Sequence, residues 1–287
     1  MVTYKNKICD EERALYGIQN AIIEDCRFAG PADGESALKE TGNLQIRRCD
    51  FRLRYPLWHT HDTVIENSTM TDTCRAALWY DKNVVIRHSN LGGIKAVREC
   101  DNTKIINTSI NSTEFGWFCR GLKMQDCELT SEYPFLKTAG LQLDHLKMKG
   151  KYSFQYVENA QIRNSVLDTK DAFWHGKNIT VYDSVVRGEY LGWYSENLKF
   201  VRCKIIGTQP LCYAKNLVLE DCEMIDCDLS FENSDVQATI RGSITSVKNP
   251  KSGQIIADNI EELIMDASAQ GSTCTVISKS EPMKQCG

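Results

Sequence analysis

Tyrosine, histidine and acidic residues recur at intervals of 19 residues along much of the chain. One series contains Glu114, Tyr133, Tyr152, Asp171, Tyr190, Gln209 and Asp228, and a second contains Tyr156, His175, Tyr194, Tyr213 and Glu232. Aromatic rings stack on the apolar faces of pyranose sugars, and carboxylates accept hydrogen bonds from sugar hydroxyls. A surface built from both series would suit an oligosaccharide ligand, so these residues are our candidate binding residues.

Catalysis on a sugar requires more than a binding surface. A glycosidase holds two carboxyl groups about 5 to 9.5 Å apart. Glu114 and Asp171 lie three repeats apart, which is roughly 14 Å if each repeat adds one strand spacing, and Asp171 and Asp228 are separated equally. Asp171 and Glu189 fall on adjacent repeats and are the closer pair, so they are the candidate catalytic residues. Whether the protein is an enzyme stays open; a polysaccharide hydrolase or lyase is the class that these residues allow.

Other kinds of site find no support in the sequence. It contains no G-x-S-x-G, glycine-rich phosphate loop, H-E-x-x-H or C-x-x-C motif, and its five histidines are scattered. We therefore expect no cofactor and no metal site. The net charge is −4 and no basic stripe is present, which argues against nucleic acid as a partner. No run reaches about 18 apolar residues, so we expect no membrane span.

The cysteines point to a location in the cell. There are 13 of them, an odd number, and most occupy repeat positions that otherwise hold small core residues. The N-terminus lacks the apolar run of a signal peptide. We expect reduced, buried thiols in a cytoplasmic protein.

The same repeat defines the elements that must position these residues. We count positions from the first residue of each repeat, and the repeats begin at Ala21, Leu44, Thr63, Val84, Thr103, Leu122, Leu141, Ala160, Ile179, Leu198, Leu217 and Val236. Positions 1, 3 and 8 are apolar, positions 2 and 4 are mostly polar, and position 6 is mostly Ser, Thr or Cys. This alternation predicts a strand with one buried face, bent at position 5, where Asn and Asp are frequent.

The residue before each repeat is Asn, Asp or Gly throughout. These residues are Asn20, Asn43, Asp62, Asn83, Asn102, Gly121, Gly140, Asn159, Asn178, Asn197, Asn216 and Asp235. They are the residue types that tolerate a left-handed backbone. The pattern predicts a tight corner in every repeat, with the asparagines stacked as a hydrogen-bonded ladder.

The aromatic residues predict a second strand late in each repeat. All five tryptophans occupy position 15, allowing for a two-residue insertion in the repeat from Thr63, whereas position 17 is small and position 18 is charged. We therefore place the tryptophans inside and position 16 outside, together with position 12 and the apolar residues of position 14. Arg98 and Gln155 at position 15 oppose this assignment, so which column faces outward stays open. The exposed face is either a ligand surface or is covered by a cap, a loop or a second subunit, which makes a homo-oligomer the alternative.

A repeat of this length has few structural solutions. Nineteen residues leave no room for a helix beside two strands, which excludes leucine-rich repeats, and no period of six is present. We predict an all-β fold, a single-stranded right-handed parallel β-helix of the pectin-lyase-like kind with about twelve coils of about 19 residues. Residues 1–20 would form an N-terminal cap, residues 21–253 the β-helix, and residues 254–287 a last coil and a C-terminal cap.

Several phrases resemble one bacterial family. They are GESALKE (34–40), RYPLW (54–58), KDAFW (170–174), GEYLGW (188–193), GTQPLCY (207–213) and SVKNPKSG (246–253). In combination they are similar to a family known only as a domain of unknown function with a β-helical fold. The resemblance implies the fold and a bacterial source, and it assigns no activity, substrate or catalytic residue.

Overall fold

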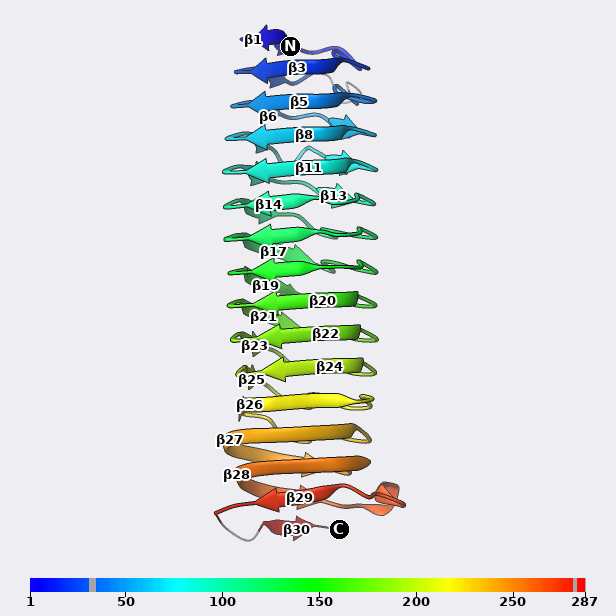
Figure 1. Cartoon of the computed structure of the whole chain (residues 1–287), viewed down its shortest axis with the longest axis vertical. Coiled ribbons are helices and arrows are strands. Elements are labelled where there is room, and N and C mark those ends of the chain that lie inside the picture. The colour runs from blue at the N-terminus through cyan, green and yellow to red at the C-terminus, as the bar shows by residue number, and fades with distance from the viewer. Residues whose placement is uncertain (31–34, 281–282, 287) are drawn as a thin grey trace. The chain divides into compact units, whose positions relative to one another are not determined.

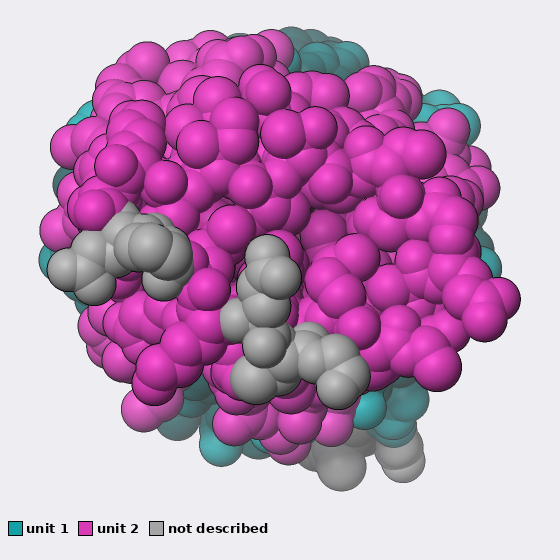
Figure 2. Space-filling view, turned by 90° about the horizontal axis from the view of Figure 1, so that it is seen from below, with its two compact units in different colours: residues 1–148 teal, residues 149–287 magenta. Residues whose placement is uncertain are grey.

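The computed structural model describes residues 1–30, 35–280 and 283–286. Within these residues the chain consists of strands, turns and loops, apart from the single 3-10 turn η1 (Ala267–Ala269). Two compact units, residues 1–148 and 149–287, are distinguished in Figure 2. Each unit is a parallel β-helix in which successive coils stack and pair through backbone hydrogen bonds (Figure 1). The predicted fold class is therefore confirmed.

Unit 1 contains two stacked series of strands and one short series. The first series comprises β1 (Val2–Lys5), β3 (Gln19–Glu24), β5 (Gly42–Arg47), β8 (His61–Glu66), β11 (Lys82–Arg87), β14 (Lys104–Ile106), β16 (Lys123–Gln125) and β18 (Gln142–Asp144). The second comprises β2 (Ile8–Cys9), β4 (Arg27–Phe28), β6 (Asp50–Phe51), β9 (Thr69–Met70), β12 (Asn90–Leu91), β15 (Ser109–Asn111) and β17 (Glu128–Glu132). The third is limited to β7 (Leu57–Trp58), β10 (Leu78–Trp79) and β13 (Val97–Arg98).

Unit 2 also contains two series of strands. The strand β19 (Lys147–Lys151) includes the boundary between the units. The strands of unit 2 are β20 (Glu158–Arg163), β21 (Val166–Lys170), β22 (Lys177–Tyr182), β23 (Val185–Arg187), β24 (Glu196–Val201), β25 (Lys204–Ile206), β26 (Leu217–Ile225), β27 (Asp235–Lys248), β28 (Ser252–Ile264), β29 (Thr275–Ser278) and β30 (Lys284–Cys286). In β26, β27 and β28 the two series merge into long strands, whereas β29 and β30 are short again.

The 19-residue register is visible in the core of unit 1. Ile86 pairs with Ile105, and Ile105 pairs with Met124. Their side chains are 0%, 0% and 2% exposed, because position 3 of every coil points inward. Like residues thus lie directly above one another, and the predicted stacking is confirmed.

The corners before position 1 adopt the left-handed conformation. Asn20, Asn102 and Asn197 have φ of 57°, 54° and 55°, and only Asp235, which begins β27, departs from this pattern. The amide of Asn102 donates to Asn83 at 2.8 Å, and Asn178, Asn197 and Asn216 each donate to the Asn one coil earlier at 3.0, 2.7 and 2.7 Å. The predicted asparagine ladder is therefore present in both units.

The bend at position 5 is also left-handed. Asp25, Asn107 and Asp183 have φ of 54°, 45° and 48°, and Arg48 and His88 reach the same conformation without an Asx side chain. Each bend residue donates its backbone N–H to the next coil, as Asn107 does to Gln125 O at 2.9 Å. Stacking hydrogen bonds therefore stabilise a conformation that would cost about 1 to 3 kcal/mol in isolation.

The late part of each coil is mostly a turn, and the prediction of a full second strand there was wrong. Positions 12 and 16 are left-handed in most coils, with φ of 55° at Tyr133 and 58° at Tyr80. Side chains of such residues do not alternate across a flat strand. Position 14 consequently points inward, and Phe135, Phe154 and Phe173 are 0% exposed instead of lying on the outer face as we expected.

Residues 1–20, which we expect to form an N-terminal cap, contain two strands that pair with the first repeat. The strand β1 pairs in register with β3, Val2 opposite Ala21, and β2 pairs with β4. This segment therefore forms a coil of its own. At the other end, β29 and β30 both pair with β28, so these two strands extend the stack.

Candidate functional site

The position-16 column of unit 1 contains His59, Tyr80, Glu99 and Phe118. Each of these residues donates its backbone N–H to the carbonyl at position 15 of the next coil, for example Tyr80 to Arg98 at 3.3 Å and Glu99 to Trp117 at 2.8 Å. These bonds fix the left-handed turn and direct the side chains outward. Tyr80 is 41% and Phe118 is 39% exposed.

A groove of about 930 Å³ lies beside this column. The other side of the groove is the position-18 column, which contains His61, Lys82, Asp101 and Arg120 from four successive coils. Glu40 and Thr60 complete the lining. Two columns of side chains, one aromatic and one charged, therefore enclose one elongated hollow in unit 1.

The acids of the groove are held as anions by specific partners. Burial raises the pKa of Glu99, but hydrogen bonds from the Tyr80 hydroxyl and the Arg98 guanidinium outweigh it and lower the pKa overall. The same hydrogen bond raises the pKa of Tyr80. Arg120 donates Nε and a second guanidinium nitrogen to Asp101 at 2.8 and 3.2 Å, which lowers the pKa of Asp101.

The two cations of the groove, Lys82 and Arg120, differ in whether they form an ion pair. Arg120 is occupied by Asp101, whereas the ammonium of Lys82 forms no ion pair within 4 Å among the described residues. Lys82 is exposed, and its charge acts on Asp101 from a longer distance. Lys82 is thus the unpaired charge that a ligand in the groove would meet.

A pair of stacked rings lies beside the position-16 column of unit 1, at position 15. The indoles of Trp58 and Trp79 lie 5.0 Å apart at an angle of 13°. Lys39 lies 3.7 Å from the Trp58 ring and Arg98 lies 5.3 Å from the Trp79 ring, so a cation caps each end of the pair. Arg98, which we had counted against buried tryptophans, is therefore accommodated by Trp79 and by Glu99 at 2.7 Å.

The tryptophan column is half-buried, neither in the core nor fully outside. In three of the five tryptophans the indole N–H donates to the position-12 carbonyl of the next coil: Trp117 to Tyr133 at 2.6 Å, Trp174 to Tyr190 at 2.7 Å, and Trp193 to Gln209 at 2.8 Å. These tryptophans tie adjacent coils together. The position-16 column is therefore the outer of the two, as we assigned it, and the tryptophans lie along its edge.

Asp81 lies beneath the groove and was not anticipated. Its side chain is 0% exposed, and burial raises the pKa of its carboxyl well above the usual range. One oxygen accepts the backbone N–H of Thr60 at 2.7 Å, and the other has no hydrogen-bond partner among the described residues. Asp81 therefore belongs to the core, where burial disfavours the ionised form of its carboxyl.

In unit 2, the candidate residues of position 16 form a continuous ladder of rings. Tyr156 stacks on His175 at 4.9 Å, His175 on Tyr194 at 5.2 Å, and Tyr194 on Tyr213 at 5.0 Å. Tyr213 also hydrogen-bonds Glu232 at 3.4 Å, and Glu232 pairs with Lys248 at 2.9 Å. The structure brings all five of these candidates together. Because each ring covers the faces of its neighbours, what the ladder presents to solvent is ring edges.

The candidate residues of position 12 are more buried than we expected. In unit 1, Tyr133 is 39% exposed, whereas Glu114 forms an ion pair with Lys95 at 2.9 Å. In unit 2, Asp171 is 9% exposed, and half-buried side chains fill the rest of the column, namely Tyr152, Tyr190, Gln209 and Asp228. This column forms the flank of the turn more than an open binding surface.

The two candidate catalytic carboxyl groups lie on adjacent coils. Asp171 donates its backbone N–H to Glu189 O at 2.9 Å. Burial raises the pKa of Asp171, Lys170 opposes this, and the charge of Glu189 adds to it. A raised pKa is the property that a general acid needs, although Glu189 itself is exposed and outside the groove of unit 1.

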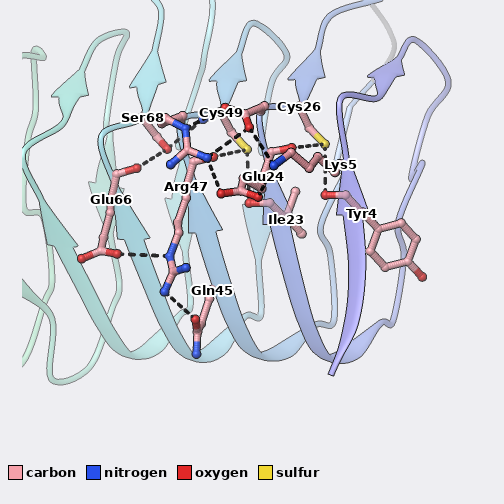
Figure 3. A network of polar contacts seen from close by, with 12 residues as sticks. Tyr4, Lys5, Ile23, Glu24, Cys26, Gln45, Arg47, Cys49, Glu66 and Ser68 are labelled. Carbon is pink, nitrogen blue, oxygen red and sulfur yellow. Dashed lines mark hydrogen bonds and ion pairs between the residues drawn. The ribbon is translucent and has the colours of Figure 1, made fainter.

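Thiols act as structural donors. The described cysteine side chains are free thiols, and all but Cys274 are buried. Figure 3 shows Cys26 donating to Tyr4 O at 3.5 Å and Cys49 donating to Ile23 O at 3.6 Å. Burial raises the pKa of Cys49 to about 12. The Cys49 thiol therefore stays protonated and unreactive at neutral pH.

The described part of the chain offers neither a cluster of metal ligands nor a membrane-spanning helix. No group of three or more His, Cys, Asp or Glu side chains there could hold a metal ion. No helix among those residues is long and apolar enough to cross a membrane. A smaller hollow of about 680 Å³ in unit 1, lined by residues such as His88, Asn107, Asp126 and His145, has no tyrosine, tryptophan or phenylalanine in its lining.

The 19-residue interval predicted the columns at positions 12 and 16, but it did not predict the groove of unit 1. Lys82, Asp101 and Arg120 had been recognised only as evidence that position 18 faces solvent. The signal that could have found the groove was the combination of alternating charge at position 18 with a carboxylate interrupting the rings at position 16.

The fold and the exposed columns define a β-helix protein with two differently built outer surfaces. The chain belongs to the family described as "Protein of unknown function (DUF3737)", whose model matches residues 2–278. No curated protein matches the sequence.

Similar solved structures are β-helical but distant. The A-module of the Azotobacter vinelandii mannuronan C-5 epimerase AlgE6 is 13% identical, with 94% of this chain and 92% of that chain covered and a TM-score of 0.42. The periplasmic alginate epimerase AlgG is 8% identical, with 94% and 79% covered and a TM-score of 0.37. PfbA, a surface adhesin of Streptococcus pneumoniae, is 10% identical, with 85% and 70% covered and a TM-score of 0.36. No functional argument rests on these likenesses.

Proposed function

We propose that the protein binds an oligosaccharide in the groove of unit 1. The observation that carries this proposal is the hollow of about 930 Å³ between the rings of Tyr80 and Phe118 and the charged column of Lys82, Asp101 and Arg120. Its size falls within the range of small-molecule sites, about 300 to 1,000 Å³. An elongated groove open to solvent suits a chain-like ligand better than a compact one.

The rings of this groove can receive a sugar. Phe118 contacts Trp117 edge-on, at an interplanar angle of 85°, and no described ring stacks on its face. Tyr80 lies on Trp79 with an angle of 18° and meets the His59 ring at a tilt of 55°, so its ring lines the groove with one parallel partner. Sugar C–H groups would pack on these faces, and hydroxyls would bond the fixed oxygens of Glu99 and Asp101 and the nitrogens of Lys82 and Arg120.

The groove supports binding better than hydrolysis. A glycosidase requires a carboxyl group that is protonated near the working pH. Glu99 and Asp101 instead have lowered pKa values and are held as anions by Arg98 and Arg120. Glu40 is paired with His59 at 2.9 Å. A carbohydrate-active role would have to use Asp171 and Glu189 in unit 2, and we place it second to binding.

Calorimetric titration of the full chain with a panel of neutral and acidic oligosaccharides tests the proposal. Wild type should bind at least one member. Phe118→Asn should weaken that binding about tenfold or more, which corresponds to about 1.4 kcal/mol. Asn tolerates the left-handed backbone, φ 55°, so this change removes the ring without straining the turn.

A matched control lies in unit 2. Tyr194→Asn removes a ring from the same position of the coil, where φ is 57°, and should leave the affinity unchanged. Absence of binding across the whole panel would reject the proposal. Equal losses in Phe118→Asn and Tyr194→Asn would reject the groove as the site.

The alternative function is a non-enzymatic assembly protein. The ring ladder of unit 2 favours it, because Tyr156 and Tyr194 are each 46% exposed although their faces are covered by stacking. Exposed aromatic edges suit a protein surface.

A further inference from the structure

The outer surface of unit 2 combines a ring ladder with a column of alternating charge. The position-18 residues are Glu158, Lys177, Glu196 and Lys215, all exposed. They lie directly opposite one another in the parallel pairing of successive coils, Glu158 with Lys177, Lys177 with Glu196, and Glu196 with Lys215. Successive charges are therefore one strand spacing apart, about 4.8 Å.

The same four coils carry the four rings. Tyr156, His175, Tyr194 and Tyr213 precede the charged residues by two positions, and the corresponding columns of unit 1 line one common groove. The two columns of unit 2 are thus neighbouring stripes of one surface. One stripe is aromatic, and the charges of the other alternate from coil to coil in the order negative, positive, negative, positive.

This charge order is complementary to its own reverse. A two-fold axis perpendicular to the columns, passing between the coils of Lys177 and Glu196, reverses the order of the second copy. Glu158 then faces Lys215 of the partner subunit, and Lys177 faces Glu196 of the partner subunit. By symmetry all four charges meet an opposite charge.

Other alignments of two such surfaces are disfavoured. If the copies run in the same direction with each coil facing its own copy, all four pairs are between like charges. If the reversed copy slips by one coil, Glu158 faces Glu196 of the partner subunit and Lys177 faces its own counterpart. Copies that run in the same direction and are shifted by one coil pair opposite charges but do not close as a dimer. Among closed two-fold dimers, the alternation therefore favours the antiparallel direction and the register in which all four charges are paired.

The same two-fold axis also places the rings of the two copies opposite each other. Tyr156 would meet Tyr213 of the partner subunit, and His175 would meet Tyr194 of the partner subunit. Because the rings already cover each other's faces at 4.9 to 5.2 Å, they offer a flat strip of edges and hydroxyls. Tyrosine-rich strips of this kind are typical of interface centres.

We propose that the protein forms a two-fold symmetric, antiparallel homodimer through this surface of unit 2. A second copy is the occupant that the charge order favours, because an interface with a different protein has no reason to be self-complementary. The rings supply the contact, and the charges supply the register. The strip is short, so the dimer should be weak and depend on concentration.

Sedimentation equilibrium of the full chain over a range of concentrations tests this geometry. Wild type should dimerise reversibly. Glu158→Lys should weaken the dimer about tenfold or more, because the new lysine faces Lys215 of the partner subunit and the two-fold axis repeats this repulsive pair. Adding Lys215→Glu to the same chain should restore wild-type affinity, since the pair is then reversed and the net charge returns to its original value.

Salt sharpens the test. Increasing ionic strength should strengthen the Glu158→Lys dimer and slightly weaken the wild-type dimer, because exposed charges are screened. Tyr194→Asn should lower affinity at every salt concentration. A wild-type monomer at all concentrations, a dimer indifferent to Glu158→Lys, or a double variant as weak as the single one would each overturn the proposal. Thermal unfolding of each variant checks that the fold is intact.

Discussion

The two units carry their exposed residues at the same coil positions but build different surfaces from them. In unit 1 the carboxylate of Glu99 lies between Tyr80 and Phe118, which puts the two rings two coils apart, about 10 Å. In unit 2 no carboxylate interrupts the rings, and neighbours stack at 4.9 to 5.2 Å. One residue per coil therefore decides whether ring faces pair with each other or remain open to a ligand.

The largest expected effect comes from making unit 1 resemble unit 2. Glu99→Tyr would place a ring between Tyr80 and Phe118 and remove the anion that fixes the Tyr80 hydroxyl. Tyrosine accepts this turn, since Tyr80 has φ of 58° and Glu99 has φ of 52°. We expect ligand binding to fall about 100-fold, close to 2.7 kcal/mol, in calorimetric titration.

Glu99→Gln is the control for filling the groove. It keeps the size of the side chain and removes only the charge, so it should weaken binding less than Glu99→Tyr does. If Gln and Tyr are equally damaging, the charge of Glu99 matters and the open space does not.

The converse change should break the ladder of unit 2. His175→Glu puts a carboxylate where unit 1 has Glu99 and removes two stacked pairs, with Tyr156 and with Tyr194. Each such pair contributes about 0.5 to 1.5 kcal/mol. We expect the free energy of unfolding to fall by about 1 to 3 kcal/mol in urea titration, and dimerisation to weaken. His175→Phe keeps a ring and should stay close to wild type; an equal loss there would contradict the role of stacking.

The sequence predicted the regular parts of the coil because one physical rule applied to each. Apolar residues at positions 1 and 3 fix the buried face, and Asn102 and Asn197 mark corners that few other residue types tolerate. The ladder of Tyr156, His175 and Tyr194 also followed directly from the 19-residue interval, since stacking turns sequence period into spatial contact.

The turns were harder to predict. Tyr80 and Tyr133 adopt left-handed conformations that bulky residues avoid, so nothing in their type signals the turn. The turn is stabilised by hydrogen bonds between coils, such as the one that the Tyr80 N–H donates to Arg98 O. Strand alternation therefore gave the wrong orientation for Phe135 and Phe173, and the groove, which depends on the turn, was missed.

A smaller effect should come from the corner ladder, which is uninterrupted in Asn159–Asn216 of unit 2 but ends at two glycines in unit 1. Gly121 has φ of 67°, and an added Cβ would meet nothing closer than 3.7 Å. Gly121→Asn should let its amide donate to Asn102, as Asn102 donates to Asn83. We expect a gain of about 1 kcal/mol in the free energy of unfolding, from the new hydrogen bond and the stiffer unfolded chain.

Gly121→Ala separates the two contributions. Alanine stiffens the unfolded chain equally but cannot hydrogen-bond and disfavours a positive φ, so it should destabilise the protein. A stabilising Ala variant would show that the ladder adds nothing.

The smallest effect concerns three acids whose pKa values shift in opposite directions, lowered at Glu99 and Asp101 in unit 1 and raised at Asp171 in unit 2. Glu99 and Asp101 have lowered pKa values and stabilise the fold above their unfolded pKa, a contribution lost as pH falls. Asp171 has a raised pKa, chiefly from burial, so its ionised form destabilises the fold at neutral pH and protonation relieves this as pH falls through the folded pKa. Asp171→Asn, at φ of 50°, should therefore raise the free energy of unfolding by less than about 1 kcal/mol at pH 7. The advantage should vanish below about pH 4, where Asp is protonated in both states; an advantage that grew on acidification would contradict burial as its cause.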